Sequence, residues 1–435
     1  MDTNRAAALK TTLPLVLLCV AVTIGGIGWQ AWDMFGPGRR SMLQGWDDSF
    51  YYFWLPSVVI DRDLDFSNQL AQSESLPAAD REAALAAPRT ATGLVPNKYP
   101  PGWAIGSAPF FLLVHAFSPA GSTGFEPRYL VAVWLGQLLY AIGGMWLATR
   151  ILQRFFPPRE SSFAALVIWL ASPLVYYQSA RLSMSHSQVF ALAMLVFWTA
   201  LRLEDGERRS RFWALLGFAS ALLVVTRNVT VVYLLMPAWV VLRQLRSARA
   251  AAALIAGAAP IVALQLLAWK VLYGRWLVYS YGGERFDFSQ LHLAEVLFSP
   301  RHGWFYWHPL LLPAVAGFAI WAIARGGAIG RAWLVSLLLM IGLAAAWPMW
   351  WLGSSFGYRG FEVGVFLAMM GWAALRQQLG RHARARVVIG SVAAAAIVWN
   401  LALLSLFLAQ RIPREEAVRY RDAAAALGEL VRPAP

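Results

Sequence analysis

Two adjacent carboxylates, Asp47 and Asp48, stand in the stretch GWDDSFYYFW, shortly after an apolar segment near the N-terminus. No lysine or arginine occurs within four residues to neutralise them. Charged groups beside an apolar phase are costly, so we expect chemistry to require these two. Two roles suit them: one of them acts as a general base, or the pair binds a divalent cation.

Cations in later polar segments supply a complement to the two acids. Arginine binds phosphate through a planar, bidentate fork, whereas lysine binds it as a point charge. A base facing such a clamp suggests group transfer from a lipid phosphate, in which the acid takes a proton from an acceptor hydroxyl and the cations neutralise the departing phosphate. The predicted phosphate-binding residues are Lys98 in NKYPPGW, Arg301 in SPRHGWFYWHP and Arg359 in SSFGYRGFE.

Further polar and aromatic residues lie in the same segments and are predicted to contact substrate. The simpler interpretations are that His186 and His308 satisfy hydrogen bonds in the core, that Arg181 is a membrane-surface anchor, and that the aromatic side chains of SFYYFWL form an interfacial belt. The histidines lack the spacing of metal ligands, so they predict no metal site, and no cofactor is predicted; a divalent cation at the paired carboxylates stays open. The predicted substrate contacts are Tyr52, Tyr99, His186, Arg227, His302, His308 and Glu362.

The composition indicates the phase in which this chemistry takes place. Of 435 residues, 59% are hydrophobic and 14% are charged, and the mean hydropathy is +0.52. A soluble domain has nearer a quarter of its residues charged. Because backbone polar groups in lipid must be satisfied within the segment, the fold class we predict is all-α and polytopic. The single cysteine, Cys19, excludes an intrachain disulfide.

The formal net charge of +14 is explained by the loops between spans and not by nucleic acid as a partner. Basic residues favour the cytoplasmic side of a membrane. The arginines expected there are Arg150, Arg154, Arg159, Arg202, Arg208, Arg209, Arg211, Arg243, Arg246, Arg249, Arg325, Arg331, Arg376, Arg381, Arg384 and Arg386.

The same bias orders the apolar segments. The run 11–32 is interpreted as a retained first span with a cytoplasmic N-terminus, because Arg5 and Lys10 precede it. Residues 101–118 are apolar, but a crossing there would invert every later loop, so we predict an embedded, non-crossing helix. The remaining predicted spans bring the total to about eleven: 129–149, 162–180, 185–203, 212–226, 229–242, 250–270, 304–324, 332–350, 360–376 and 387–409.

A single transmembrane domain is predicted over residues 1–410. Its first outer loop, 31–128, carries interfacial helices, including a helical patch at 78–87, and an outer tail at 411–435 forms a surface helix. The pair 212–226 and 229–242 is short enough to be one long or broken helix. No internal repeat is visible.

Several blocks of the sequence resemble bacterial membrane glycosyltransferases of the GT-C superfamily. The run DDSFYYFWLPSVVIDRDLDFSN at 47–68 resembles their first outer loop, and NKYPPG at 97–102 is similar to the element that opens their embedded helix. The blocks MSH at 184–186, SPRHGWFYWHPLLL at 299–312 and WLGSSFGYRGF at 351–361 follow in the same order.

The resemblance implies a GT-C-like fold and an inverting transfer of a sugar from a polyprenyl-phosphate donor, as in protein O-mannosyltransferases and aminoarabinose transferases. It implies a multi-pass protein of the bacterial inner membrane with a periplasmic site, whose partners are the lipid-linked donor, membrane lipid and a periplasmic glycan, lipid or protein acceptor. The family base maps to Asp47, although many relatives carry glycine in place of Asp48, so the choice between the two stays open. Lys98 and Arg359 match the donor-phosphate contacts.

Two other functions share these features. A carrier or flippase of lipid-linked sugars should place ionisable groups near the middle of its spans, where this chain is almost wholly apolar apart from Arg227 and Asn228. A polymerase of lipid-linked oligosaccharides would usually use a large late outer loop, and the loop 271–303 is modest.

Overall fold

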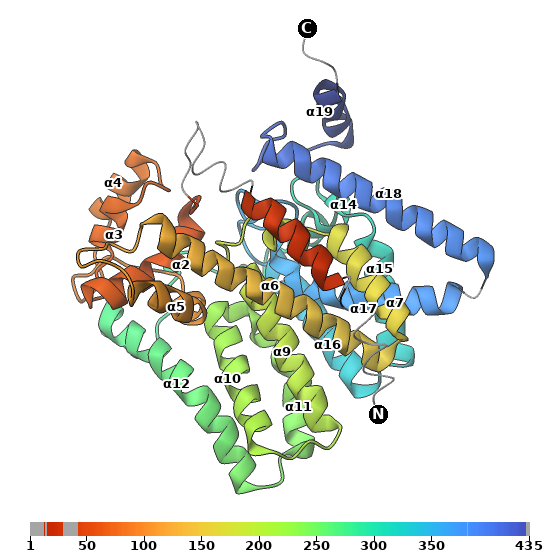
Figure 1. Cartoon of the computed structure of the whole chain (residues 1–435), viewed down its shortest axis with the longest axis horizontal. Helices are drawn as coiled ribbons and strands as arrows, with labels where there is room; N and C mark the ends of the chain where they lie inside the picture. Colours follow the sequence, from red (N-terminus) through yellow and green to blue (C-terminus); the bar gives the residue numbers. More distant parts are fainter. Residues whose placement is uncertain (1–12, 14, 29–41, 381, 432–435) are drawn as a thin grey trace.

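The fold is helical throughout the part that the computed structural model describes, which comprises residues 13, 15–28, 42–380 and 382–431, and no strand occurs there. The all-α class predicted from the sequence is therefore confirmed (Figure 1). The predictions that concern Arg5, Lys10, the start of the first loop and the end of the tail fall outside the described residues.

Within these ranges, five helices have the length and apolar composition to cross a membrane. They are α6 (Pro127–Phe155), α9 (His186–Glu204), α12 (Ala248–Tyr273), α16 (Gly327–Ala345) and α18 (Ala383–Leu408). Shorter apolar helices are Leu15–Gly28, α5 (Gly102–His115), α10 (Ser210–Thr226) and α15 (Leu311–Ala324). Helices thus lie at the predicted positions, while the total of about eleven spans stays a prediction.

Several predicted spans are interrupted, including 304–324, which consists of α14 (Trp304–Trp307) and α15. The span at 162–180 consists of α7 (Pro158–Leu170) and α8 (Leu174–Tyr177), because Pro173 lacks the N–H that a continuous helix needs. The region 212–242 is not one helix, because the backbone is extended at Arg227. It continues as η2 (Asn228–Leu234) and α11 (Leu235–Gln244).

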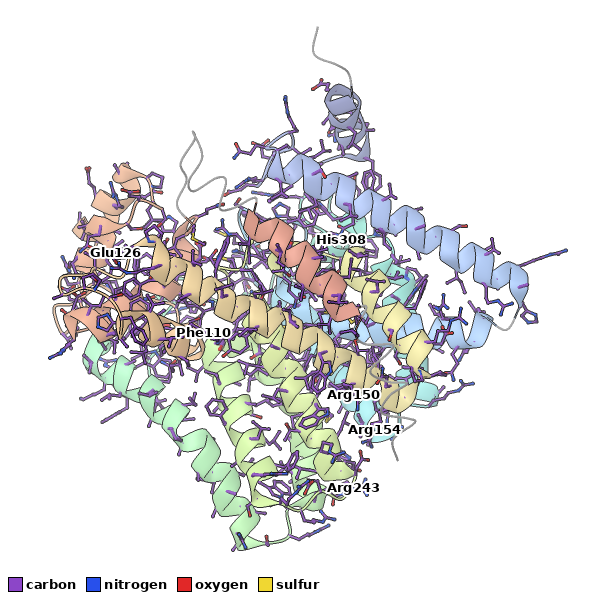
Figure 2. The ribbon with its side chains drawn as sticks, in the orientation of Figure 1. Phe110, Glu126, Arg150, Arg154, Arg243 and His308 are labelled. Atoms are coloured by element: carbon purple, nitrogen blue, oxygen red, sulfur yellow. The ribbon has the colours of Figure 1, made fainter. Side chains whose placement is uncertain are left out.

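Polar contacts join several loops at one end of the helix bundle. Arg154 at the end of α6 forms an ion pair with Asp205 after α9, and Arg243 near the end of α11 lies 3.2 Å from Glu204. Figure 2 shows Arg154 and Arg243, together with Arg150, on the same side of the molecule, with Glu126 on the opposite side. We call the side of Arg154, Asp205, Glu204 and Arg243 the arginine-rich end.

The opposite end, which we call the pocket end, carries the short helices of the first loop. They are α2 (Trp46–Pro56), η1 (Ser57–Asp61), α3 (Ser67–Gln72) and α4 (Ala78–Ala86), and α4 matches the helical patch expected at 78–87. The last turn of α12 reaches this group, where Thr92 donates a hydrogen bond of 2.6 Å to the carbonyl of Leu272.

The aromatic side chains of α2 form a second hydrophobic core rather than an interfacial belt. Tyr52 and Phe53 are fully buried, and Phe50, Tyr51 and Trp54 are nearly so. They pack with aromatic residues of α5 and of the first turns of α6. The interpretation of these residues as a surface belt is therefore wrong, because the helices of the first loop cover them.

Helix α5 lies against the half of α6 nearest the pocket end. Tyr140 of α6 donates a hydrogen bond of 3.0 Å to the carbonyl of Gly106, and Tyr129 contacts His115 at 2.9 Å. At 14 residues the helix is about 21 Å long, shorter than a hydrocarbon core. This placement and length suit the predicted non-crossing helix.

The remaining elements close the bundle and its tail. Helix α17 (Glu362–Leu379) packs against α15 and α7. The tail contains α19 (Tyr420–Val431), in which Tyr420 stacks on Tyr306 at 4.3 Å between ring centroids.

Candidate active site

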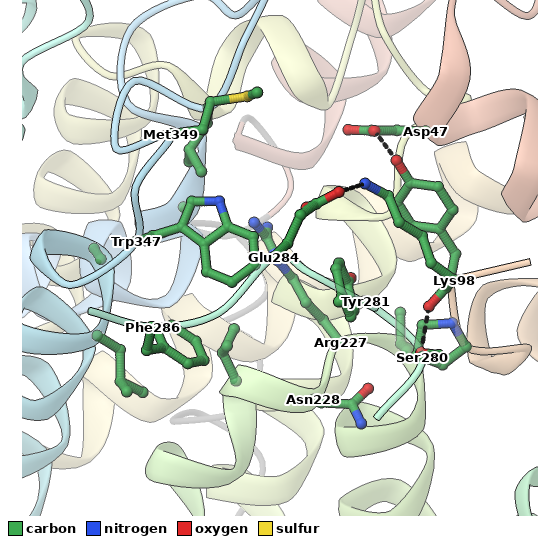
Figure 3. Close-up of a pocket in the computed structure, with 18 of the residues that line it drawn as sticks. Asp47, Lys98, Arg227, Asn228, Ser280, Tyr281, Glu284, Phe286, Trp347 and Met349 are labelled. Atoms are coloured by element: carbon green, nitrogen blue, oxygen red, sulfur yellow. Dashed lines mark hydrogen bonds and ion pairs between the residues drawn. The ribbon is translucent and has the colours of Figure 1, made fainter. Parts of the chain in front are cut away.

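A cavity of about 260 Å³ opens at the pocket end, between α2, the segment 98–100, the turn after α10 and the segments 278–286 and 340–360. Aromatic and apolar side chains make up most of its wall, as is usual for a ligand site. Figure 3 shows the polar groups converging in it. Its charged residues are Asp47, Lys98, Arg227, Glu284 and Arg359.

Asp47, in the first turn of α2, faces this cavity and is about one quarter exposed. Its Oδ2 atom lies 2.8 Å from the guanidinium of Arg359, and its Oδ1 atom accepts a hydrogen bond from the hydroxyl of Tyr99. The predicted base and a predicted phosphate contact are therefore ion-paired with one another.

Opposing effects set the pKa of Asp47. Burial favours the neutral acid, but the charge of Arg359 and the hydrogen bond from Tyr99 outweigh it, so the pKa of Asp47 lies below its usual range. Burial and the nearby charge of Asp47 raise the pKa of Tyr99 far above its usual range. Tyr99 is therefore a protonated hydrogen-bond donor, and Asp47 is an ionised carboxylate, at neutral pH.

Asp48 points away from the cavity and is fully buried. Its Oδ2 atom accepts hydrogen bonds from the amide of Gln44 at 2.9 Å and the hydroxyl of Ser183 at 2.8 Å, and lies 3.1 Å from the guanidinium of Arg181. Arg181 is thus the counter-ion of Asp48 and not a surface anchor. The lack of lysine or arginine within four residues suggested that the two acids are unpaired, but arginines distant in the sequence neutralise both of them.

The structure holds Lys98 at the cavity wall through its neighbours. Asn97 donates a hydrogen bond of 3.0 Å to the carbonyl of Phe50 in α2 and accepts one of 3.0 Å from the amide of Tyr99. Trp54 donates to the carbonyl of Tyr99 at 3.2 Å. The segment NKY is therefore fixed to the same helix that carries Asp47.

The ammonium group of Lys98 forms an ion pair with Glu284. It also lies 5.5 Å from the ring centroids of both Tyr99 and Tyr281, a cation–π arrangement. Ser280 donates a hydrogen bond of 2.7 Å to the carbonyl of Lys98 (Figure 3). The segment that contains Tyr281 and Glu284 thus lies directly on Lys98.

Arg227 lines the cavity beside Asn228 and is supported from behind. Its guanidinium lies 3.1 Å from Glu362 at the start of α17, and His186 at the start of α9 lies 3.3 Å from the same carboxylate oxygen. His186 and Glu362 are nearly fully buried. Of these predicted substrate contacts, only Arg227 faces the cavity, and the other two hold it in place.

Arg301 and His302 lie outside the cavity lining. The guanidinium of Arg301 stacks 3.8 Å from the ring centroid of Trp351 and donates a hydrogen bond to the carbonyl of Glu415. His302 is fully buried, with its Nδ1 atom 2.8 Å from the carbonyl of Trp351. Burial lowers the pKa of His302 to about 4, so the ring is neutral at physiological pH.

His308 and Tyr52 also lie away from the cavity. His308 is buried beside Phe356 and Gly357, and a Cβ atom on Gly357 would approach the ring to 2.2 Å. Tyr52 is fully buried and donates a hydrogen bond to the carbonyl of Gly124, while its neighbour Tyr51 lines the cavity.

Sequence reasoning missed Glu284, Tyr281 and Tyr51. The loop 271–303 was judged by its length alone, yet the run VYSYGGERF brings a carboxylate and two tyrosines to the cavity. The sequence did contain a signal for Glu284: like Asp47, it is an acidic residue close to two tyrosines in a predicted outer loop. Tyr51 and Tyr52 are adjacent, and only the orientation of α2 distinguishes them.

The paired carboxylates do not form a metal site in this arrangement. Asp47 and Asp48 bind different arginines, Arg359 and Arg181, and only Asp47 faces the cavity. Over the ranges that the structure covers, no group of three or more histidine, cysteine, aspartate or glutamate residues lies close enough to hold a metal ion.

The chain is a polytopic, helical membrane protein: it has helices long and apolar enough to cross a membrane, short helices in its first loop and a charged cavity at one end. No protein-family model and no curated protein sequence matches the chain. Among solved structures it is similar to ArnT from Cupriavidus metallidurans in the apo state, with a TM-score of 0.48 and 15% identity over 96% of this chain and 75% of that one.

The structure of the same ArnT bound to undecaprenyl phosphate aligns with a TM-score of 0.50 and 16% identity, over 95% of this chain and 76% of that chain. This second comparison shows a shared fold. The GT-C-like fold predicted from the blocks of sequence is thereby confirmed.

Proposed function

We propose that the chain is a membrane glycosyltransferase that transfers a sugar, with inversion, from a polyprenyl-phosphate donor to an acceptor hydroxyl. The observation that carries this proposal is the meeting of Asp47 with Lys98, Arg227 and Arg359 in one cavity. Asp47 shares the cavity with these three cations and with Glu284, and an ionised acid close to several cations is what deprotonation of an acceptor and binding of a phosphate require. The fold shared with an ArnT that binds undecaprenyl phosphate supports a lipid-linked donor.

We propose Asp47, and not Asp48, as the base. Asp47 is ionised, lines the cavity and is partly exposed, so an acceptor hydroxyl can reach it. Asp48 is fully buried behind it and pairs with Arg181. The role of Asp48 is to fix the first turn of α2 and thereby orient its neighbour.

In the proposed reaction, the acceptor oxygen attacks the anomeric carbon, and its proton passes to Asp47. The bond between the anomeric carbon and the phosphate oxygen breaks, and the electron pair leaves with the polyprenyl phosphate. Lys98, Arg227 and Arg359 stabilise the departing anion. When phosphate binds Arg359, this guanidinium gains a second anion and weakens its hold on Asp47, so the carboxylate becomes a stronger base as the donor arrives.

This assignment gives the site an orientation in the membrane and a kind of acceptor. The pocket end faces the periplasm and the arginine-rich end the cytoplasm of a bacterial inner membrane, because basic loops favour the inner side. The acceptor is a periplasmic glycan, lipid or protein, and no nucleic acid takes part. In this proposal the cationic side chains supply the electrostatic stabilisation, and no cofactor takes part.

The test uses purified protein in lipid with a panel of radiolabelled polyprenyl-phosphate sugars and crude envelope extract as acceptor. We expect the wild type to release polyprenyl phosphate and Asp47→Asn to release it about 10²–10⁴ times more slowly. The matched control is Arg243→Gln at the arginine-rich end, which should keep full activity. Donor that binds but is never consumed would contradict the proposal and favour a carrier, and transfer of whole lipid-linked oligosaccharides to one another would favour a polymerase.

A further inference from the structure

Three cations face the cavity, and each meets a carboxylate. The pairs are Arg359 with Asp47, Arg227 with Glu362, and Lys98 with Glu284. An incoming phosphate must therefore compete with carboxylates that already hold its binding groups. Which carboxylate leaves its partner decides how tightly the donor binds.

The three carboxylates differ in what holds them. Glu362 is the first residue of α17, and its side chain is 5% exposed. Because this side chain also contacts His186, no solvent lies beside it into which it could move. Asp47 accepts a hydrogen bond from Tyr99 and has the role of base. The side chain of Glu284 is 46% exposed, lies in a segment without helix or strand and has Lys98 as its ion-pair partner.

We propose that Glu284 is the displaceable counter-ion of the donor site: it holds Lys98 in the empty cavity and exchanges with the lipid phosphate when the donor binds. This inference rests on the proposed function. The exchange leaves the ammonium of Lys98 paired before and after binding, while the carboxylate of Glu284 returns to water at little cost because it is already half exposed.

Other contacts keep Lys98 in position while its anion changes. Ser280 holds the carbonyl of Lys98 at 2.7 Å, and the rings of Tyr99 and Tyr281 flank its ammonium. Tyr279 donates a hydrogen bond of 2.6 Å to the carbonyl of Glu284, which fixes the backbone of Glu284. Only the side chain of Glu284 has to change its conformation when the phosphate binds. Glu284 is thus a positioning residue that sets donor affinity.

The test measures binding of undecaprenyl phosphate to the full chain in phosphatidylcholine nanodiscs. We expect Glu284→Gln to lower the Kd about two- to fivefold, the range expected from removal of a competing exposed ion pair. The matched control is Glu295→Gln, an exposed acid of α13 (Leu293–Phe298) outside the cavity, which should leave the Kd unchanged. Tighter binding is a readout that loss of structure would not produce.

A double-mutant cycle identifies Lys98 as the residue through which Glu284 acts. In the Lys98→Met background, which should bind undecaprenyl phosphate more weakly than the wild type, the effect of Glu284→Gln should vanish. A gain of the same size in that background, or an unchanged or higher Kd for Glu284→Gln in the wild-type background, would overturn the inference alone. No binding of undecaprenyl phosphate by the wild type would overturn the proposed function and this inference with it.

Discussion

Both ends of the helix bundle contain ion pairs between arginine and a carboxylate, but these pairs differ in their exposure to solvent. At the arginine-rich end, Arg243 is 53% exposed where it pairs with Glu204, and Asp205 is 52% exposed where it pairs with Arg154. At the pocket end, Asp48 is fully buried with Arg181. Arg376 with Glu160, away from the cavity, is a partly buried exception.

This difference in exposure distinguishes two kinds of charged residue: those that reflect the orientation of the helices in the membrane, and those that belong to a functional site. An exposed pair gains little, because water and salt screen it. A buried pair costs desolvation that its own attraction barely repays, so its retention indicates a further role. The pocket end carries the buried carboxylates Asp48 and Glu362 with their arginines, beside the half-exposed pair of Lys98 and Glu284, and the proposed chemistry lies there.

The largest effect is expected from Asp47→Asn, which removes the proposed base while keeping the size of the side chain. We expect turnover to fall by about 10²–10⁴. Binding of undecaprenyl phosphate should persist, because Lys98, Arg227 and Arg359 remain. Turnover measured with a radiolabelled donor checks this, and activity within tenfold of wild type would contradict the assignment of Asp47.

Arg181→Met should affect stability more than chemistry, because it leaves Asp48 buried without its counter-ion. Removal of one partner of a buried pair costs about 3–5 kcal/mol. Thermal unfolding in detergent should show the loss, and the double variant Asp48→Asn/Arg181→Met should recover part of it. A double variant no more stable than Arg181→Met would disprove the pairing as the cause.

Arg359→Gln should change the pH dependence of activity, because it removes the ion-pair partner of Asp47 at the pocket end. Arg359 is the strongest of the effects that lower the pKa of Asp47, so the pKa should rise when its charge is removed. Asp47 acts when ionised, so the acid limb of kcat/KM should move to higher pH, by about 1–3 units for loss of one opposite charge. The rate should also fall by about 10²–10³ for the lost phosphate contact. An unmoved acid limb would show that Arg359 does not control the base.

The smallest effect is expected at the arginine-rich end. Arg243→Gln breaks an exposed pair with Glu204, so neither the unfolding temperature nor turnover should change measurably. A loss comparable with that of Arg181→Met would break the comparison between the two ends.

Much of the fold and part of the site were predictable from the residues. Pro127 and Pro158 mark the starts of α6 and α7, and Gly274 in the left-handed conformation ends α12. The sequence also singled out Asp47, Lys98, Tyr99, Arg227 and Arg359, all of which line the cavity. The other predicted site residues on the periphery, Arg301, His302, His308 and Tyr52, have side chains that face other elements, and His186 and Glu362 lie behind Arg227.

The helical membrane class and the positions of most helices can be predicted from the residues, because hydrophobicity adds up along a local run and prolines and glycines act within one turn. The residues also determine which segments carry charge. The ion pairs of Asp47 with Arg359, Asp48 with Arg181 and Lys98 with Glu284 became visible in the folded chain alone. These pairs depend on how helices far apart in the chain pack together, and no local pattern of residues encodes that contact.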